Sequence, residues 1–263
     1  DLAYRDPWVR NSPVAAGLEF HQRKQDSRYV RQSYGIDVRG EAAEDMIVGA
    51  SYLRLSTTPQ EGYGARVLNG SDQSLVGLSF SYDIRDDAVT PRSGSVYSTE
   101  YHTGRKNIGG IGGSSGHTTQ RIRFDLGFYA SPFRTHSVLF EGHWSDVRSG
   151  MLDVSDLGRL GGATDLRGYR EGEFLGSRLL WGTAEYRLFL APRSFLGAFL
   201  DAGAVTRPAL PSIGLSSSDL MRFGYGLALR VDAPVGLLSV SIALGKGDGF
   251  GDAKLHVRVQ NEF

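Results

Sequence analysis

The stretch "RIRFDLGFYA" at residues 121–130 decides the fold class, because its side chains alternate between two kinds. A period of two residues is that of a β-strand, which turns successive side chains to opposite faces of its sheet. One face of this strand would be apolar and the other strongly polar. The two sets are Ile122, Phe124, Leu126, Phe128 and Ala130 against Arg121, Arg123, Asp125 and Tyr129.

The same alternation recurs in "LVGLSFSYDIR" (75–85), "MRFGYGLALRVD" (221–232) and "KLHVRVQNEF" (254–263), so the chain is predicted to be all-β. Turn residues rich in Gly and Pro separate about twelve such segments. The predicted strands are 13–22, 28–39, 45–56, 74–86, 94–105, 117–131, 135–147, 177–190, 195–206, 220–233, 236–246 and 253–263.

Three properties favour a transmembrane antiparallel β-barrel over a soluble β-sandwich, which also alternates. The segments are long, about 9 to 13 residues, where soluble strands average about 5 or 6. Their apolar faces carry aromatic residues at strand ends, as in the girdles of outer-membrane barrels. Their polar faces hold arginine, glutamate and histidine, which a dry sandwich core could not hold unpaired but a hydrated lumen can. One barrel domain spanning 1–263 is therefore expected.

Composition excludes several other classes. The 263 residues include 29 basic and 29 acidic side chains, so no nucleic-acid footprint is expected. The chain has no cysteine, hence neither a disulfide framework nor a thiolate metal site, and its histidines lack metal-ligand spacing. No cofactor is expected. No apolar run approaches the 18 or so residues of a membrane helix. The sequence begins at "DLAYRDPW" without a basic-then-apolar leader, so any signal peptide is expected to lie outside it.

The connections predict an orientation. An even strand count would place both termini on the periplasmic side of a bacterial outer membrane. The connections after even strands are short, at 90–94, 131–135, 191–195 and 233–236. The long ones follow odd strands and would face outward, at 56–74, 104–119 and 148–176.

The last of these loops contains "GGATDLRGYREGEF" (161–174), which allows three interpretations. A phosphate cradle would need these glycines between a strand and an amphipathic helix, and no such helix follows. A mobile surface loop is a second interpretation. In the third, the loop folds back into the lumen, and its Arg167 meets carboxylates on the inner wall. Alternation places Glu185 and Asp201 of the next two strands on that wall.

"LRGY" (166–169), followed by "EYR" (185–187) and "FLDAG" (199–203), resembles the superfamily of outer-membrane insertases and two-partner-secretion transporters, the bacterial surface antigen barrels related to BamA, TamA and FhaC. "YDIRDDAVTPRSG" (82–94) resembles a periplasmic turn of that family, and "GYGLALRVDAPVGLLSVSIA" (224–243) resembles a hairpin near its C-terminus. These matches span about residues 75 to 263, in the family's order.

The resemblance implies a loop that plugs the lumen and is held there by its arginine. It also implies that Phe263, at the end of an alternating strand, is a signal for the machinery that assembles outer-membrane barrels. The residues carried over are Leu166, Arg167, Gly168 and Tyr169 as the loop-lock motif, with Glu185 and Asp201 as its partners on the lumen wall.

The resemblance also implies an integral protein of a Gram-negative outer membrane, in contact with its lipid and lipopolysaccharide, that translocates or inserts protein or lipid. The client is not identified by the sequence. Full-size members have roughly sixteen strands, about eleven of them before this loop, where about seven are predicted here. No periplasmic POTRA domain precedes the first predicted strand, so a short form is expected. The alternative function is a non-transporting anchor or scaffold barrel of an oligomeric assembly or of a larger, for example patatin-like, protein.

An enzyme is the other class to weigh. His102, His136 and His143 have serines nearby in sequence, at 98, 137 and 145, but no G-x-S-x-G elbow is present. We therefore expect no catalytic residues. A homodimer stays open as an alternative, because small residues such as Ala198 and Ala202 thin the lipid face of two predicted strands.

Overall fold

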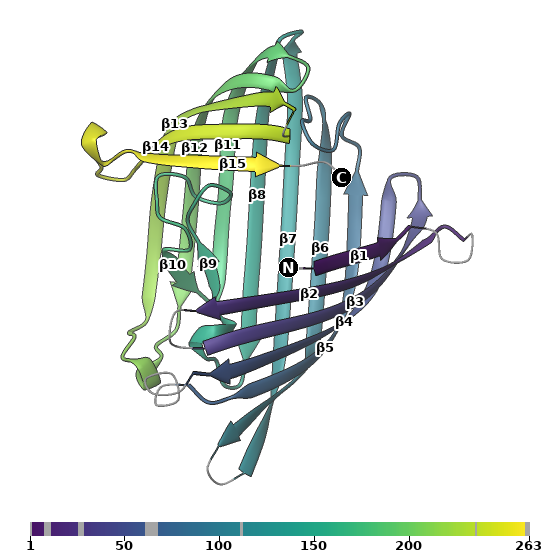
Figure 1. Ribbon diagram of the computed structural model, residues 1–263, viewed down its shortest axis with the longest axis vertical. Coiled ribbons are helices and arrows are strands. Elements are labelled where there is room, and N and C mark those ends of the chain that lie inside the picture. Colours follow the sequence, from purple (N-terminus) through teal and green to yellow (C-terminus); the bar gives the residue numbers. More distant parts are fainter. Residues whose placement is uncertain are drawn as a thin grey trace.

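The protein is described by a computed structural model that covers residues 2–7, 12–25, 29–60, 68–110, 113–234 and 236–260. These residues form a 13-stranded antiparallel sheet, with strands in chain order, and a separate 2-stranded hairpin. Figure 1 shows the sheet curving around an interior. The strands of the sheet are β1 (Leu2–Asp6), β2 (Val14–Gln25), β3 (Tyr29–Ala43), β4 (Met46–Pro59), β5 (Ser71–Asp83), β6 (Gly94–Gly110), β7 (Gly113–Phe133), β8 (His136–Ser149), β11 (Arg178–Ala191), β12 (Ser194–Arg207), β13 (Ser218–Ala233), β14 (Gly236–Gly245) and β15 (Lys254–Gln260).

The apolar face of the sheet is the exposed one. In β5, Gln73 and Leu75 are buried against the interior, whereas Val76 and Leu78 point outward and are 60% and 68% exposed. The same inversion continues around the sheet, where large apolar side chains stand on the outside of β7, β8, β12 and β13. An exposed apolar surface of this extent marks a membrane or a partner rather than bulk water.

The predicted strand count of about twelve is wrong, although each predicted segment overlaps one strand of the sheet. The thirteenth strand is β1, which pairs with β2 from Leu2↔Phe20 to Asp6↔Ala16. The other two strands of the chain are β9 (Gly158–Leu160) and β10 (Phe174–Gly176), three residues each, which form the separate hairpin. Eight strands therefore precede the 150–177 loop, not seven, and five follow it.

The odd strand count also removes the basis for placing both termini on one side. In an antiparallel sheet of 13 strands, the first and last strands run in the same direction, as the arrowheads of β1 and β15 show (Figure 1). Within the described residues, β1 pairs with β2 and β15 with β14, and no pairing joins β1 to β15. Phe263, the predicted assembly signal, lies outside the described residues.

The predicted long loop at 104–119 is mostly strand. β6 and β7 pair continuously from Gly94↔Tyr129 to Gly110↔Gly113, as a hairpin that reaches beyond the neighbouring strands (Figure 1). Main-chain hydrogen bonds maintain this pairing, also around the tip of the hairpin, where the sequence is rich in Gly and Ser. Side-chain composition alone therefore gave the wrong prediction for this segment.

The connection between β8 and β11 lies against the inner wall and forms two apolar clusters. Its first half includes the short 3-10 helix η2 (Val154–Asp156) and packs Val154 and Leu157 with Tyr29, Leu68 and Leu210. Its second half packs with the inner face of β11 and β12; this cluster comprises Leu160, Leu166, Tyr169, Leu179 and Val205. No helix in the described part of the chain is long and apolar enough to cross a membrane.

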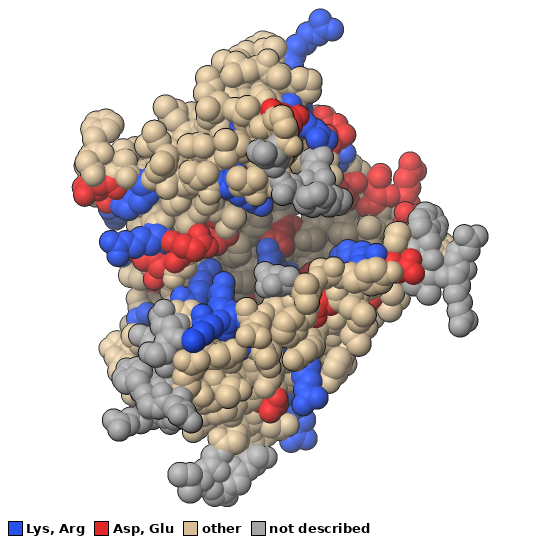
Figure 2. Space-filling view, in the orientation of Figure 1, with Lys and Arg blue, Asp and Glu red and all other residues tan. Residues whose placement is uncertain are grey.

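Charged side chains gather around the interior. On the face seen in Figure 2, Lys, Arg, Asp and Glu line the hollow between the β13–β15 side and the β1–β5 side, and much of the surrounding surface carries other residues. In a water-soluble protein most charged side chains lie on the outer surface and most large apolar ones lie inside, so this distribution is the reverse.

Candidate functional site

The tip of the 150–177 loop binds two carboxylates of the inner wall through Arg167. The guanidinium donates from Nη1 to Glu185 Oε2 at 2.8 Å, from Nη2 to Asp201 Oδ1 at 2.7 Å and from Nε to Asp201 Oδ2 at 2.8 Å. The backbone N–H of Arg167 also donates to Asp201 Oδ2 at 3.0 Å. Asp201 thus accepts a two-pronged fork, the strongest geometry available to an arginine–carboxylate pair.

Both carboxylates are held in place by further neighbours. Glu185 lies on β11 and also accepts from Arg187 Nε at 2.8 Å. Asp201 lies on β12, is fully buried and accepts from Thr183 Oγ1 at 2.9 Å. The face of Phe199 lies under the Arg167 guanidinium, 3.3 Å from ring centroid to Cζ. Two carboxylates and an aromatic face therefore surround the arginine on the wall side.

Arg167 stays charged in this setting. Burial alone would lower the pKa of its guanidinium, but the hydrogen bonds and charges of Asp201 and Glu185 outweigh burial and raise that pKa above its ordinary value. Removing one partner of such a buried, paired group is costly, because the other is left without compensation.

The residues that flank Arg167 fit the wall closely. Gly168 has φ +92°, and a Cβ on it would lie 2.7 Å from the backbone of Leu244. On β13, a Cβ at Gly224 would lie 1.8 Å from the carbonyl oxygen of Arg167. Leu166 is fully buried in the apolar cluster beside β11 and β12. Glycine is required at 168 by conformation and at 224 by the close approach of two backbones.

Tyr169 joins the tip to the next two strands. Its hydroxyl donates to the carbonyl of Phe223 in β13 at 2.9 Å. The same hydroxyl accepts from the N–H of Lys246, just after β14, at 2.9 Å. The N–H of Gly168 donates to Nε2 of His256 on β15, at 3.2 Å. The tip therefore contacts every strand from β11 to β15.

Replacing Tyr169 with phenylalanine is expected to loosen the tip by about 1–2 kcal/mol, because two partly buried backbone groups lose their partner. Hydrogen exchange of residues 163–170 should accelerate accordingly, while exchange of the strands stays unchanged. Tyr225→Phe, on the exposed face of β13, is the matched control and is expected to leave the loop as in the parent. Equal exchange in the two variants would contradict the role of the Tyr169 hydroxyl.

Little space is left beside the tip. A cavity of about 140 Å³ lies next to Arg167, and polar and charged side chains dominate its lining. They include Glu141, Arg187, Arg230 and Arg258. Such a volume has room for several water molecules beside the tip.

The three histidines considered for catalysis contact side chains other than the serines near them in sequence. His102 Nε2 lies 3.0 Å from Ser51 Oγ, and His143 Nδ1 lies 2.6 Å from Asp125 Oδ1 while its ring stacks on Trp181. His136 contacts the hydroxyl of Tyr186. No group of three or more potential metal ligands comes together among the described residues.

The structure brings all the described residues of the predicted motif to one place. Leu166, Arg167, Gly168 and Tyr169 lie together at the tip, and Glu185 and Asp201 both contact Arg167. Sequence reasoning missed His256, which no spacing connects to the loop, and Phe199, although alternation places Phe199 on the same face as Asp201. Gly224 could have been found, since a glycine in an alternating strand suggests close approach of another backbone.

Comparisons with known proteins find one family and two similar structures. Residues 1–263 match the Omp85 superfamily domain. The structure of BamA from Haemophilus ducreyi lacking POTRA domains 1–3 is similar, with a TM-score of 0.67 and 17% identity over 97% of this chain and 59% of that chain. CdiB from Acinetobacter baumannii gives a TM-score of 0.48 and 14% identity over 89% and 50%. No curated protein matches the chain. The chain thus spans well under two thirds of these structures.

Proposed function

Since the chain belongs to the Omp85 superfamily, we propose that it forms an outer-membrane β-barrel that translocates or inserts protein or lipid. In this proposal the interior is closed at rest by the 150–177 loop, and Arg167 is the lock. The barrel is not an enzyme and needs no cofactor or metal.

The observation that carries the proposal is the contact of Arg167 with two wall carboxylates. A loop that served only as a surface connection would have no need to place a charged residue on two buried acids, at a cost in desolvation. Retaining such a costly contact is understandable if the loop must be held in one position and released in another. This is a two-state element of the kind that gating requires.

The exposed apolar face supports a membrane location. Lipid chains would cover the outward side chains of β5, β7 and β13, and the charged interior would remain hydrated. The partners that follow are outer-membrane lipid with lipopolysaccharide, and the machinery that recognises the C-terminal strand. A homodimer is the remaining partner proposal.

The test uses the purified protein in liposomes. A small unfolded outer-membrane barrel protein is added, and its folding rate is followed by heat-modifiable electrophoretic mobility. The proposal predicts faster folding than in empty liposomes of the same lipid. Arg167→Ala should change that rate, whereas Arg170→Ala, an exposed arginine three residues along, should not.

A second candidate is favoured by the small space left beside the tip: an anchor or scaffold barrel that transports nothing. In this case the added barrel protein should fold at the same rate in liposomes that contain the parent or either variant as in empty liposomes. That result, together with electrical silence of all three in planar bilayers, would replace the translocation proposal with the anchor.

A further inference from the structure

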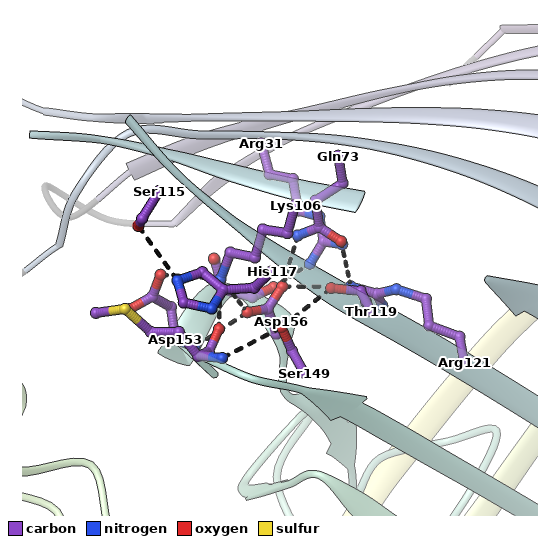
Figure 3. A network of polar contacts seen from close by, with 12 residues as sticks. Arg31, Gln73, Lys106, Ser115, His117, Thr119, Arg121, Ser149, Asp153 and Asp156 are labelled. Atoms are coloured by element: carbon purple, nitrogen blue, oxygen red, sulfur yellow. Dashed lines mark hydrogen bonds and ion pairs between the residues drawn. The ribbon is translucent and has the colours of Figure 1, made fainter. Parts of the chain in front are cut away.

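A second set of buried contacts holds the beginning of the loop to the opposite wall (Figure 3). Its centre is Lys106 of β6, whose side chain is fully buried. Lys106 Nζ donates to Asp153 Oδ2 at 3.0 Å, to Asp156 Oδ2 at 2.5 Å and to the carbonyl of Met151 at 3.1 Å. A single lysine thus binds three groups of the 151–156 segment.

Asp156 is surrounded by donors from several strands. Besides Lys106, it accepts from Gln73 Nε2 of β5 at 2.7 Å, from Arg121 Nη2 of β7 at 3.3 Å and from the N–H of Asp153 at 3.0 Å. Arg31 of β3 donates to the carbonyl of Ser155. The segment is therefore attached to β3, β5, β6 and β7, none of which Arg167 contacts in the described hydrogen bonds.

The cations of this cluster outnumber its carboxylates by one. Two loop carboxylates, Asp153 and Asp156, face Lys106, Arg121 and Arg31. Burial of the Asp156 carboxyl acts to raise its pKa. The charge and hydrogen bond of Lys106 act in the opposite direction, and the resulting pKa lies below its ordinary value. Asp156 is thus held ionised by its surroundings.

A pair of glycines separates the two attached parts of the loop. Gly161 and Gly162 have φ of +119° and +117° and lie between the 151–156 segment and the tip at 166–169. Only glycine adopts such backbone angles readily. The segment and the tip are therefore separated along the chain by two positions whose backbone conformation requires glycine.

We propose that Lys106, Asp153 and Asp156 form a second anchor, separable from Arg167, and that the 150–177 loop is a strap across the interior between the β3–β7 wall and the β11–β15 wall. A strap limits the separation of the two walls only while both of its ends are attached. The width of the sheet, whose β1 and β15 edges are not paired among the described residues, would then be controlled by either end. This inference goes beyond the lock at Arg167 and holds whether or not the barrel moves a client.

The chain has no cysteine, so single cysteines can report on each anchor. Ser155→Cys places one at the second anchor, where Ser155 Oγ is buried and has no hydrogen-bond partner in the described structure. Leu166→Cys places one at the tip. The rate of reaction with a charged methanethiosulfonate reagent measures exposure of each position in the folded, full-length chain.

Lys106→Met is expected to raise the reaction rate at position 155 by about a hundredfold, because buried Asp153 loses its cation among the described ion pairs and Asp156 keeps only Arg121. The rate at position 166 should change little. Arg167→Ala should do the reverse. Arg105→Met is the matched control: it removes the same charge from the neighbouring, exposed residue of β6 and should change neither rate.

Two results would overturn separable anchors. One is a rate at position 155 that is the same in Lys106→Met and Arg105→Met. The other is an equal rise at both positions in Lys106→Met, which would mean that the loop moves as one body. If Lys106→Met fails to fold, as judged by heat-modifiable mobility, Asp156→Asn keeps the shape of the side chain, removes its charge and must give the same selective exposure of position 155.

The strap is tested separately by the distance between spin labels at positions 78 and 200, both exposed on the outside of β5 and β12. A strap cut at either end is slack, so Lys106→Met should broaden the distance distribution as much as Arg167→Ala, and the double variant should add nothing. Broadening by Arg167→Ala alone, or additive broadening in the double variant, would contradict the strap.

Discussion

Arg167→Ala is expected to release residues 163–170 from the wall while the strands remain folded. The substitution removes three side-chain hydrogen bonds and the contact with Phe199, and it leaves Asp201 buried without a cation among the described ion pairs, whereas Glu185 keeps Arg187. Breaking a buried pair in this way costs about 3–5 kcal/mol. The strands do not depend on it, because their backbone bonding is complete without the loop.

Hydrogen exchange measured by mass spectrometry checks this result, since loop and strand peptides are read in one experiment. Arg170→Ala, at an exposed position of the same loop, should leave exchange unchanged. Arg167→Lys keeps the charge but lacks the planar fork, and should fall between Arg167→Ala and the parent. Protection of residues 163–170 that survives in Arg167→Ala would show that the arginine is not the lock.

The second large effect is expected from Gly224→Ala. A Cβ at this position would lie 1.8 Å from the carbonyl oxygen of Arg167, so the tip and β13 cannot keep their present separation. The loop is the part with freedom to move, because β13 is fixed by hydrogen bonds to β12 and β14. We expect the tip to leave the wall although Arg167 itself is intact, with rapid exchange of residues 163–170.

Gly142→Ala is the control for Gly224→Ala. Gly142 lies on β8, and a Cβ there would meet nothing within 4 Å. Both substitutions lower the entropy of the unfolded chain in the same way, so a difference between them reports on the contact with the loop. Equal loop protection in the two variants would mean that the tip does not approach β13 as closely as described.

Alternation of side chains predicted the strands well where both faces are distinct. The β7 and β13 segments were clear because large apolar residues alternate with charged residues in β7, and with Gly, Ala and Arg in β13. β1 could not be predicted, because five residues, "LAYRD", are too few to distinguish a period from chance. The extension of the β6–β7 hairpin was missed since its many Gly and Ser residues give no alternating side-chain signal, although main-chain pairing continues through it.

The two anchors of the loop differ in how far sequence reveals them. At the tip, a short motif marks Arg167, and alternation places Glu185 and Asp201 on the same inner face. At the other end, Lys106 and Asp156 are 50 residues apart and belong to no motif. Their contact depends on how the sheet curves and on where the loop crosses it, and neither follows from local pattern.

The central claim is that the attached loop closes the interior, and the most direct test is planar-bilayer conductance of the purified parent beside Arg167→Ala and Gly224→Ala. The account predicts silence from the parent and large, flickering currents from both variants, because each frees the tip by a different physical route. Silence from all three would show that the interior stays closed without the lock, and equal currents from the parent and the variants would show that the loop closes nothing.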